Sequence, residues 1–380
     1  MIHMDFTLSP QQEMLKDTVR RFAERDIDPK VKEMEEADEV SMDIIEKMAE
    51  LGLLGIVIPK EYEGTEMGHV ARVVAIEEIS RISAAAAHTL GVLHVGQGPV
   101  LYYGSREQKE KWLPSMARGE KLATLALTEP SGGSDVRGLQ TTVKQEDDSY
   151  IINGRKCFIT NSHIAHLFAV VAKDEKGELS CYMVDKSTSG LILGREEKKF
   201  GLMGCNTGEV IFDNCSVPKE NLVGEEGKGL RVALSSIDNL GRPGIGAIAL
   251  GILRRCLEEA VKFAKERVLY GKPIIKLQAT QWKITDIYMD YEVSRLLNYY
   301  AACLRDKRQR CDAENALAKF WSTEAAIRSA VKAISVLGGY GSLRDYVPQR
   351  LLRDAQPLTS SAGTSDIMRL VMMRKASDIV

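Results

Sequence analysis

The spacing of apolar residues along this 380-residue chain changes twice. Over residues 10–56 and 70–117, apolar side chains recur at steps of three and four positions, as Leu15, Val19 and Phe22 do. This period keeps them on one face of a helix. The chain is therefore predicted to begin with an all-helical domain over residues 1–120.

At Lys121 the pattern changes to short apolar runs, such as LATLALT and HLFAVVA, separated by clusters of Gly, Asp, Asn and Ser. Such runs are typical of strands joined by turns. Because no helical period interrupts them, residues 121–228 are predicted to form an antiparallel β-barrel or sandwich domain. From residue 229 to 380 the helical period returns in long segments, which predicts a C-terminal four-helix bundle. The expected fold class is α+β, mostly α.

Composition narrows the classes of function. Hydrophobic residues make up 44% and charged residues 27% of the chain, and the formal net charge of −2 offers no basic face to nucleic acid. No apolar run approaches the roughly 20 residues that a membrane span needs, and the N-terminus does not have the pattern of a secretory signal. The seven cysteines are dispersed without Cys-x-x-Cys spacing, which indicates reduced thiols in a cytoplasmic protein and no metal site.

Two segments of the strand-rich region suit a flat or anionic ligand. In LTEPSGGSD, residues 127–135, a strand runs into a turn whose glycines let a ligand approach the main chain. Further on, Phe158 and Thr160 are two positions apart on a strand, so that the ring and the hydroxyl share one face. Each pattern alone also fits an ordinary strand–loop connection or a core aromatic.

Two more segments follow in the helical part of the chain. A helix ends at ERVLYGK, residues 266–272, where Arg267 offers a planar guanidinium suited to a pyrophosphate; the simpler interpretation is a solvated helix end with a glycine stop. Near the C-terminus the chain reads GGYGSLRDYVPQRLLRDAQPLTSSAGTSDIMR, residues 338–369.

Together, in this order and spacing, these segments closely resemble the acyl-CoA dehydrogenase family, and the resemblance runs from Phe6 to Met373. It implies FAD as cofactor, an acyl-CoA substrate, an electron-transferring flavoprotein as redox partner, and a homotetramer active in fatty acid or organic acid metabolism. The implied reaction is α,β-dehydrogenation of the thioester, in which the α-proton leaves and the β-hydrogen passes as hydride to flavin N5.

The resemblance also assigns roles to residues. Thr128 and Thr160 would hydrogen-bond the flavin, and Phe158 would pack against it, where the family often has Trp. Arg267 and Gln278 would contact the FAD of a neighbouring subunit. The residues implied for FAD are Leu127, Thr128, Gly133, Ser134, Phe158, Thr160, Arg267, Gln278, Gly338, Gly339, Thr364, Ser365 and Asp366. Those implied for the substrate are Ser134, Asp238, Asn239 (usually Asp in the family), Arg242 and Gly363.

Position 362 departs from the family. Where the family usually has a catalytic glutamate before Gly-Thr-Ser, this chain has Ala362. A minority of the family carries the glutamate at the position of Gly241, so that base is absent too. The main-chain N–H of residue 362, which in the family hydrogen-bonds the thioester carbonyl, survives the change. A positioned general base contributes typically ~10²–10⁴-fold in rate, so dehydrogenation is expected to be weak unless another group compensates.

Four explanations of Ala362 stay open. The alanine is an engineered replacement, or another side chain serves as base. For the second case the candidate is His94, because an imidazole titrates near neutrality, although a packed helix histidine is the simpler interpretation. Alternatively the reaction needs no abstraction of the α-proton, as in an acyl-CoA decarboxylase or desulfinase; a carrier-protein-linked oxidase on the same scaffold is a further alternative. In the last case the chain is a non-catalytic relative that binds FAD and acyl-CoA.

Overall fold

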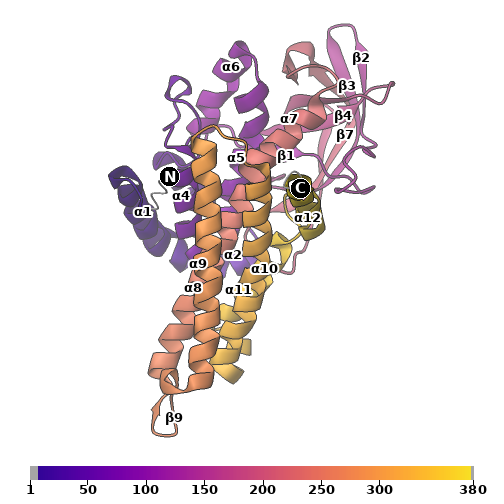
Figure 1. The fold of residues 1–380 in the computed structure, drawn as a ribbon. Coiled ribbons are helices and arrows are strands. Elements are labelled where there is room, and N and C mark those ends of the chain that lie inside the picture. The colour runs from indigo at the N-terminus through magenta and orange to yellow at the C-terminus, as the bar shows by residue number, and fades with distance from the viewer. Residues whose placement is uncertain (1–6, 378–380) are drawn as a thin grey trace.

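The computed structural model describes residues 7–377. Phe6, at which the family resemblance begins, lies outside this range, as do the outermost ends of the predicted first and last domains. Helices come first along the chain, then a sheet, then helices again (Figure 1). This is the order that the apolar spacing predicts.

Six helices make up the N-terminal part. The first of them, α1, begins behind Ser9, whose hydroxyl accepts the N–H of Gln12 while the Gln12 side chain accepts the N–H of Ser9. This reciprocal cap fixes the start of the helix. The helices are α1 (Pro10–Phe22), α2 (Val31–Ala37), α3 (Met42–Glu50), α4 (Gly68–Ile82), α5 (Ala84–Tyr103) and α6 (Arg106–Ala117).

Eight strands form one sheet in the middle of the chain: β1 (Ala123–Ala126), β2 (Thr142–Glu146), β3 (Ser149–Thr160), β4 (Leu167–Lys173), β5 (Leu179–Asp185), β6 (Leu191–Glu196), β7 (Thr207–Pro218) and β8 (Leu222–Val223). Their order is β6-β7-β3-β2-β4-β5-β8, with β1 paired to β4. Most pairs are antiparallel, as predicted, but β1–β4 and the short β2–β4 contact are parallel. The sequence of pairs ends at β6 and β8 without joining them, so a closed barrel is not shown.

The C-terminal helices are α7 (Gly229–Ser236), α8 (Arg242–Glu266), α9 (Gln278–Asp306), α10 (Asp312–Leu337), α11 (Val347–Leu358) and α12 (Ser365–Ala376). A π-helical turn over Ile237–Gly241 joins α7 to α8. A small hairpin of β9 (Val268–Leu269) and β10 (Lys272–Pro273) joins α8 to α9. It forms the far tip of the bundle, at the end away from the sheet (Figure 1).

The two helical parts share one hydrophobic core, which runs from α1 to α11. Ile79 of α4 and Ile248 of α8 belong to it, and both are fully buried. A second apolar cluster lies between the sheet and the helices, with Leu113 of α6, Val171 of β4 and Val232 of α7 among its members. Among residues 7–377, no helix is both long and apolar enough to cross a membrane.

Candidate functional site

Positions 241 and 362, at which the resemblance implies a glutamate, lie face to face. Gly241 ends the π-helical turn before α8, and a Cβ built on it would lie 3.4 Å from the Cβ of Ala362. Ala362 lies in the turn between α11 and α12, and it is half-buried. Neither position brings a carboxylate to this point of contact.

The turn over residues 359–363 presents the main chain of Ala362. The N–H groups of Ser360 and Ser361 donate back to the carbonyl of Pro357, each at 3.2 Å. Ala362 then takes the left-handed conformation, with φ 54°, and Gly363 follows with φ 103°. Within residues 7–377 no acceptor receives the Ala362 N–H. This donor is therefore available to a ligand.

Lys319 of α10 lies beneath this turn, and the sequence analysis missed it. Its Nζ donates to the carbonyls of Thr359 and Gly363, each at 2.7 Å. The side chain is wholly buried, which lowers the pKa of its ammonium group to about 7. A single lysine on a helix resembles many solvated lysines. The only signal was its place among small and apolar residues in NALAKFW.

The residues implied for the CoA side gather on the π-helical turn and the start of α8. Arg242 donates to Asp238 at 2.6 Å, and Asn239 donates to the hydroxyl of Ser235 at 3.0 Å. Burial raises the pKa of Asp238 in spite of the neighbouring guanidinium. Because Gly241 belongs to the same turn, these polar groups lie close to the Gly241–Ala362 contact.

Phe158, near the end of β3, exposes its ring so that a flat ligand can stack on it. Phe158 has φ 54° and leaves 65% of its surface exposed. The register between β3 and β7 shifts at this point, between Lys156 and Ile159. A bulky residue in the left-handed region is rare and costs free energy. Such a ring, held out of the core, fits the side of a planar group such as a flavin.

The segment of residues 127–135, LTEPSGGSD, is hydrogen-bonded to β3 next to Phe158. The N–H of Cys157 donates to the carbonyl of Thr128 at 2.9 Å, so the chain that follows β1 lies against this part of β3. Thr128 and Thr160 are both half-buried. The structure thus brings Thr128, Phe158 and Thr160 to one region.

A buried ion pair anchors the loop that carries Gly133 and Ser134. Lys156 is fully buried, and its Nζ lies 2.7 Å from the Glu129 carboxylate. Burial alone would raise the pKa of Glu129, but the hydrogen bonds from Lys156 and from the N–H groups of Thr141 and Gln140 prevail and lower it. Glu129 therefore has a structural role in the turn.

A second group of residues implied for FAD lies at the tip of the bundle. The guanidinium of Arg267 lies 5.8 Å from the ring centre of Tyr340, next to Gly339, and Gln278 begins α9 beside the hairpin. Helix α8 separates Arg267 from Gly241, and its 25 residues span roughly 38 Å. Within one chain, the residues implied for FAD thus fall into two distant groups.

The residues at the start of α12 make hydrogen bonds within the chain. Thr364 caps the helix by accepting the N–H of Ile367. The hydroxyl of Ser365 donates to Glu324 at 2.6 Å. Asp366 is exposed and pairs with Arg369 at 2.6 Å.

His94 is engaged on both ring nitrogens. Its Nδ1 accepts from Nε of Arg72 at 2.9 Å, which leaves the proton on Nε2, 2.8 Å from the carbonyl of Leu53. Burial, aided by the Arg72 charge, lowers the pKa of the imidazole to about 3. That His94 serves as a base stays a prediction, and this geometry argues against it.

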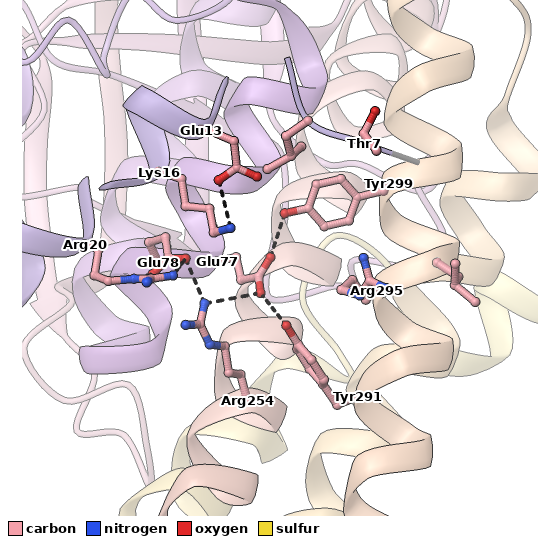
Figure 2. A pocket seen from close by; sticks show the side chains of 12 residues that line it. Thr7, Glu13, Lys16, Arg20, Glu77, Glu78, Arg254, Tyr291, Arg295 and Tyr299 are labelled. Carbon is pink, nitrogen blue, oxygen red and sulfur yellow. Dashed lines mark hydrogen bonds and ion pairs between the residues drawn. The ribbon is translucent and has the colours of Figure 1, made fainter. Parts of the chain in front are cut away.

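A polar cavity of about 440 Å³ lies elsewhere, between α1, α4, α8 and α9 (Figure 2). In it the carboxylate of Glu77 accepts from Tyr291 at 3.1 Å and from Tyr299 at 2.8 Å. Arg254 donates to Glu78 at 2.7 Å. None of the residues implied for FAD or substrate lines this cavity. Ion pairs among its charged groups join α1, α4 and α8, and the two tyrosine hydroxyls join α9 to α4.

Comparison with known proteins identifies the family of the chain. Three family models match: acyl-CoA dehydrogenase N-terminal domain over residues 9–120, middle domain over 124–215 and C-terminal domain over 227–377. An acyl-CoA dehydrogenase of Bacillus subtilis (strain 168) is 42% identical over 97% of this chain and 98% of its own length.

Two further relatives are informative. The CarC subunit of the caffeyl-CoA reductase–Etf complex of Acetobacterium woodii is 36% identical over 96% of this chain and 97% of its own. The crystal structure of an acyl-CoA dehydrogenase complexed with FAD from Bacillus anthracis matches with a TM-score of 0.93 and 30% identity, over 99% of this chain and 69% of that one. The chain belongs to the acyl-CoA dehydrogenase family.

Proposed function

We propose that this chain is an FAD-dependent oxidoreductase that acts on acyl thioesters. The thioester carbonyl of the substrate binds at the turn formed by residues 359–363. The observation that carries the proposal is the Gly241–Ala362 contact, with the unengaged N–H of Ala362 beside it. A main-chain donor of this kind stabilises negative charge that develops on a carbonyl oxygen. FAD supplies the hydride acceptor when it is bound.

The residues of the sheet domain suit that cofactor. Phe158 would cover one face of the flavin, and Thr128 and Thr160 would hydrogen-bond its edge. The left-handed backbone and the exposed ring of Phe158 support this assignment. An exposed ring buries little apolar surface within its own chain, so it contributes little to the stability of the fold. The Bacillus anthracis relative, whose fold matches, is a complex with FAD.

The substrate end of the site suits a CoA thioester. Arg242 and Asn239 offer donors close to Gly241, and Ser134 lies in the loop that Glu129 and Lys156 anchor. Without a carboxylate at position 241 or 362, removal of the α-proton from a saturated substrate is expected to be slow. We infer that the chain binds the thioester well and dehydrogenates it poorly.

The second candidate is a reaction that forms the α-carbanion when a carboxylated or sulfinated acyl thioester loses carbon dioxide or sulfur dioxide. The electrons of the broken bond stay on carbon, and water converts the sulfur dioxide to sulfite. This candidate is favoured by two observations together: both glutamate positions lack an acid, and His94 has no free nitrogen. Such a reaction would still use the Ala362 N–H, because the carbanion's charge is shared with the thioester oxygen.

We further propose a homotetramer in which a neighbouring subunit supplies Arg267 and Gln278. The distance of roughly 38 Å along α8 keeps those residues from the flavin site of their own chain. Helix α9 also exposes a row of large apolar side chains, which a second copy would cover. The row consists of Trp282, Tyr288, Met289, Val293, Leu296 and Tyr300. Sedimentation of a species of four chains supports this assembly, and a monomer carrying FAD contradicts it.

The decisive experiment is an anaerobic titration of the FAD-loaded protein with a panel of saturated, carboxylated and sulfinated acyl-CoAs. Bleaching of the flavin absorbance marks a dehydrogenation substrate, and release of carbon dioxide or sulfite marks the second candidate. Reoxidation by an electron-transferring flavoprotein tests the proposed redox partner. Protein that cannot be reconstituted with FAD would contradict both candidates.

A further inference from the structure

We propose that Lys319 is a positioning residue that holds the Ala362 N–H in place for the thioester carbonyl, an inference that rests on the proposed function. Lys319 does not touch the reacting atoms in this proposal. It acts through the turn that presents the donor.

The contacts of Lys319 span the turn from end to end. Its Nζ lies 2.7 Å from the carbonyl of Thr359, the first residue of the turn, and 2.7 Å from that of Gly363, the last. One ammonium group thus ties both ends of a five-residue loop to α10. Ala362 lies between the two attachment points, and its own main chain has no hydrogen-bond acceptor among residues 7–377.

The charge of Lys319 has no carboxylate partner within ion-pair distance among those residues. Glu324 is the acid that favours its charged form, and that acid accepts from Ser365, while the nearby Arg242 disfavours the charge. The other wholly buried lysine, Lys156, has Glu129 at 2.7 Å. Burial of a cation without such a partner costs free energy, which disfavours the ammonium form. The N–H groups of Nζ can donate to the two carbonyls in either protonation state.

The turn needs an external support because its conformation is strained. Ala362 has φ 54°, a region that a side-chain-bearing residue rarely adopts, whereas Gly363, with φ 103°, adopts a positive φ without that penalty. The hydrogen bond to the Gly363 carbonyl fixes the peptide between residues 363 and 364, just after the strained Ala362, and the bond to the Thr359 carbonyl fixes the peptide between residues 359 and 360, where the turn begins. A displacement of about 1 Å in a positioning group costs on the order of 10²-fold in rate, so small relaxation of the turn would weaken carbonyl polarisation.

The test uses Lys319→Met in the FAD-loaded protein, with Lys332→Met as matched control on the same helix. Lys332 pairs with Asp286 at 2.9 Å, away from the turn. The probe is cinnamoyl-CoA, whose conjugated thioester absorbs at longer wavelength when its carbonyl is polarised. We expect K319M to lose at least half of the red shift seen in the unaltered protein and to bind the probe about tenfold more weakly. K332M should match the unaltered protein in both measurements, and FAD content should be equal in all three.

The outcomes separate the two proposals. If the unaltered protein neither binds nor shifts the probe, the proposed function fails and this inference fails with it. If the unaltered protein and K319M shift the probe equally, the proposed function stands and the role of Lys319 is wrong. If K319M does not fold, Lys319→Gln replaces it as the test. Glutamine is a shorter, neutral donor, so the red shift of the probe should lie between zero and the full value. A full red shift in this variant overturns the proposal.

Discussion

Gly241 and Ala362 meet at van der Waals distance: a Cβ on the glycine would lie 3.4 Å from the Cβ of the alanine. Two segments more than a hundred residues apart thereby share one point in space. A carboxylate introduced on either residue would project from the same contact. The two positions at which the family resemblance implies a base are thus neighbours in the fold.

Ala362→Glu should restore proton abstraction. We expect the rate of flavin reduction by a saturated acyl-CoA to rise about 10²- to 10⁴-fold, the usual contribution of a positioned base. Anaerobic stopped-flow absorbance measures that rate. Ala362→Gln keeps the size and removes the basicity, so equal rates in the Glu and Gln variants would contradict this explanation.

Gly241→Glu, made without changing Ala362, should restore part of the flavin reduction by a saturated acyl-CoA. Gly241 has φ −66°, which any residue adopts, and the nearest atoms to an added Cβ lie at ordinary contact distances of 3.4 Å and more. We expect a gain of at least tenfold over Gly241→Gln in the same assay. Loss of FAD in both variants would show that the contact cannot accept the longer side chain, and equal rates in the two would contradict the prediction.

Phe158→Ala should weaken FAD binding. Removal of an aromatic contact costs about 1.5 kcal/mol, which corresponds to roughly tenfold in dissociation constant. Flavin fluorescence on dilution measures the release. Phe158→Trp, the residue common in the family, serves as the control and should retain the cofactor; equal release from the Ala variant and the unaltered protein would place the flavin elsewhere.

His94→Gln should make the free energy of unfolding fall less steeply as the pH is lowered. The pKa of the buried imidazole is about 3 in the folded protein and about 6.5 in the unfolded chain. Between pH 6 and 4 the unfolded state therefore binds one more proton, and stability falls as pH falls. Without this imidazole the slope should decrease by about 1.4 kcal/mol per pH unit.

Urea unfolding at several values of pH measures that slope. The lost hydrogen bonds to Arg72 and Leu53 destabilise the variant by an amount that does not depend on pH. Only the difference in slope is therefore informative, and parallel curves for the two proteins would mean that the imidazole is already charged in the fold.

The sequence was sufficient for what depends on local spacing. Helical period and strand runs follow from neighbouring residues, and the order of helices, sheet and helices is confirmed. The left-handed backbone of Phe158 and the register shift beside it interrupt the strand alternation from which a face shared with Thr160 is predicted. The parallel pairing of β1 with β4 and the open edges at β6 and β8 depend on which strands meet, and apolar alternation does not encode that. The partners of His94 and Lys319 come from distant segments, so a helix pattern could not reveal that one is fully engaged and the other supports a turn.

The shared core of α4 and α8 has a consequence for how the molecule unfolds. Each helix packs apolar side chains into the core that the other shares, although one belongs to the N-terminal helices and the other to the bundle. Neither part retains a complete interior if the other melts. Heating should therefore give a single cooperative heat-absorption peak for both helical parts, and a C-terminal fragment expressed without residues 7–120 should expose this surface and aggregate.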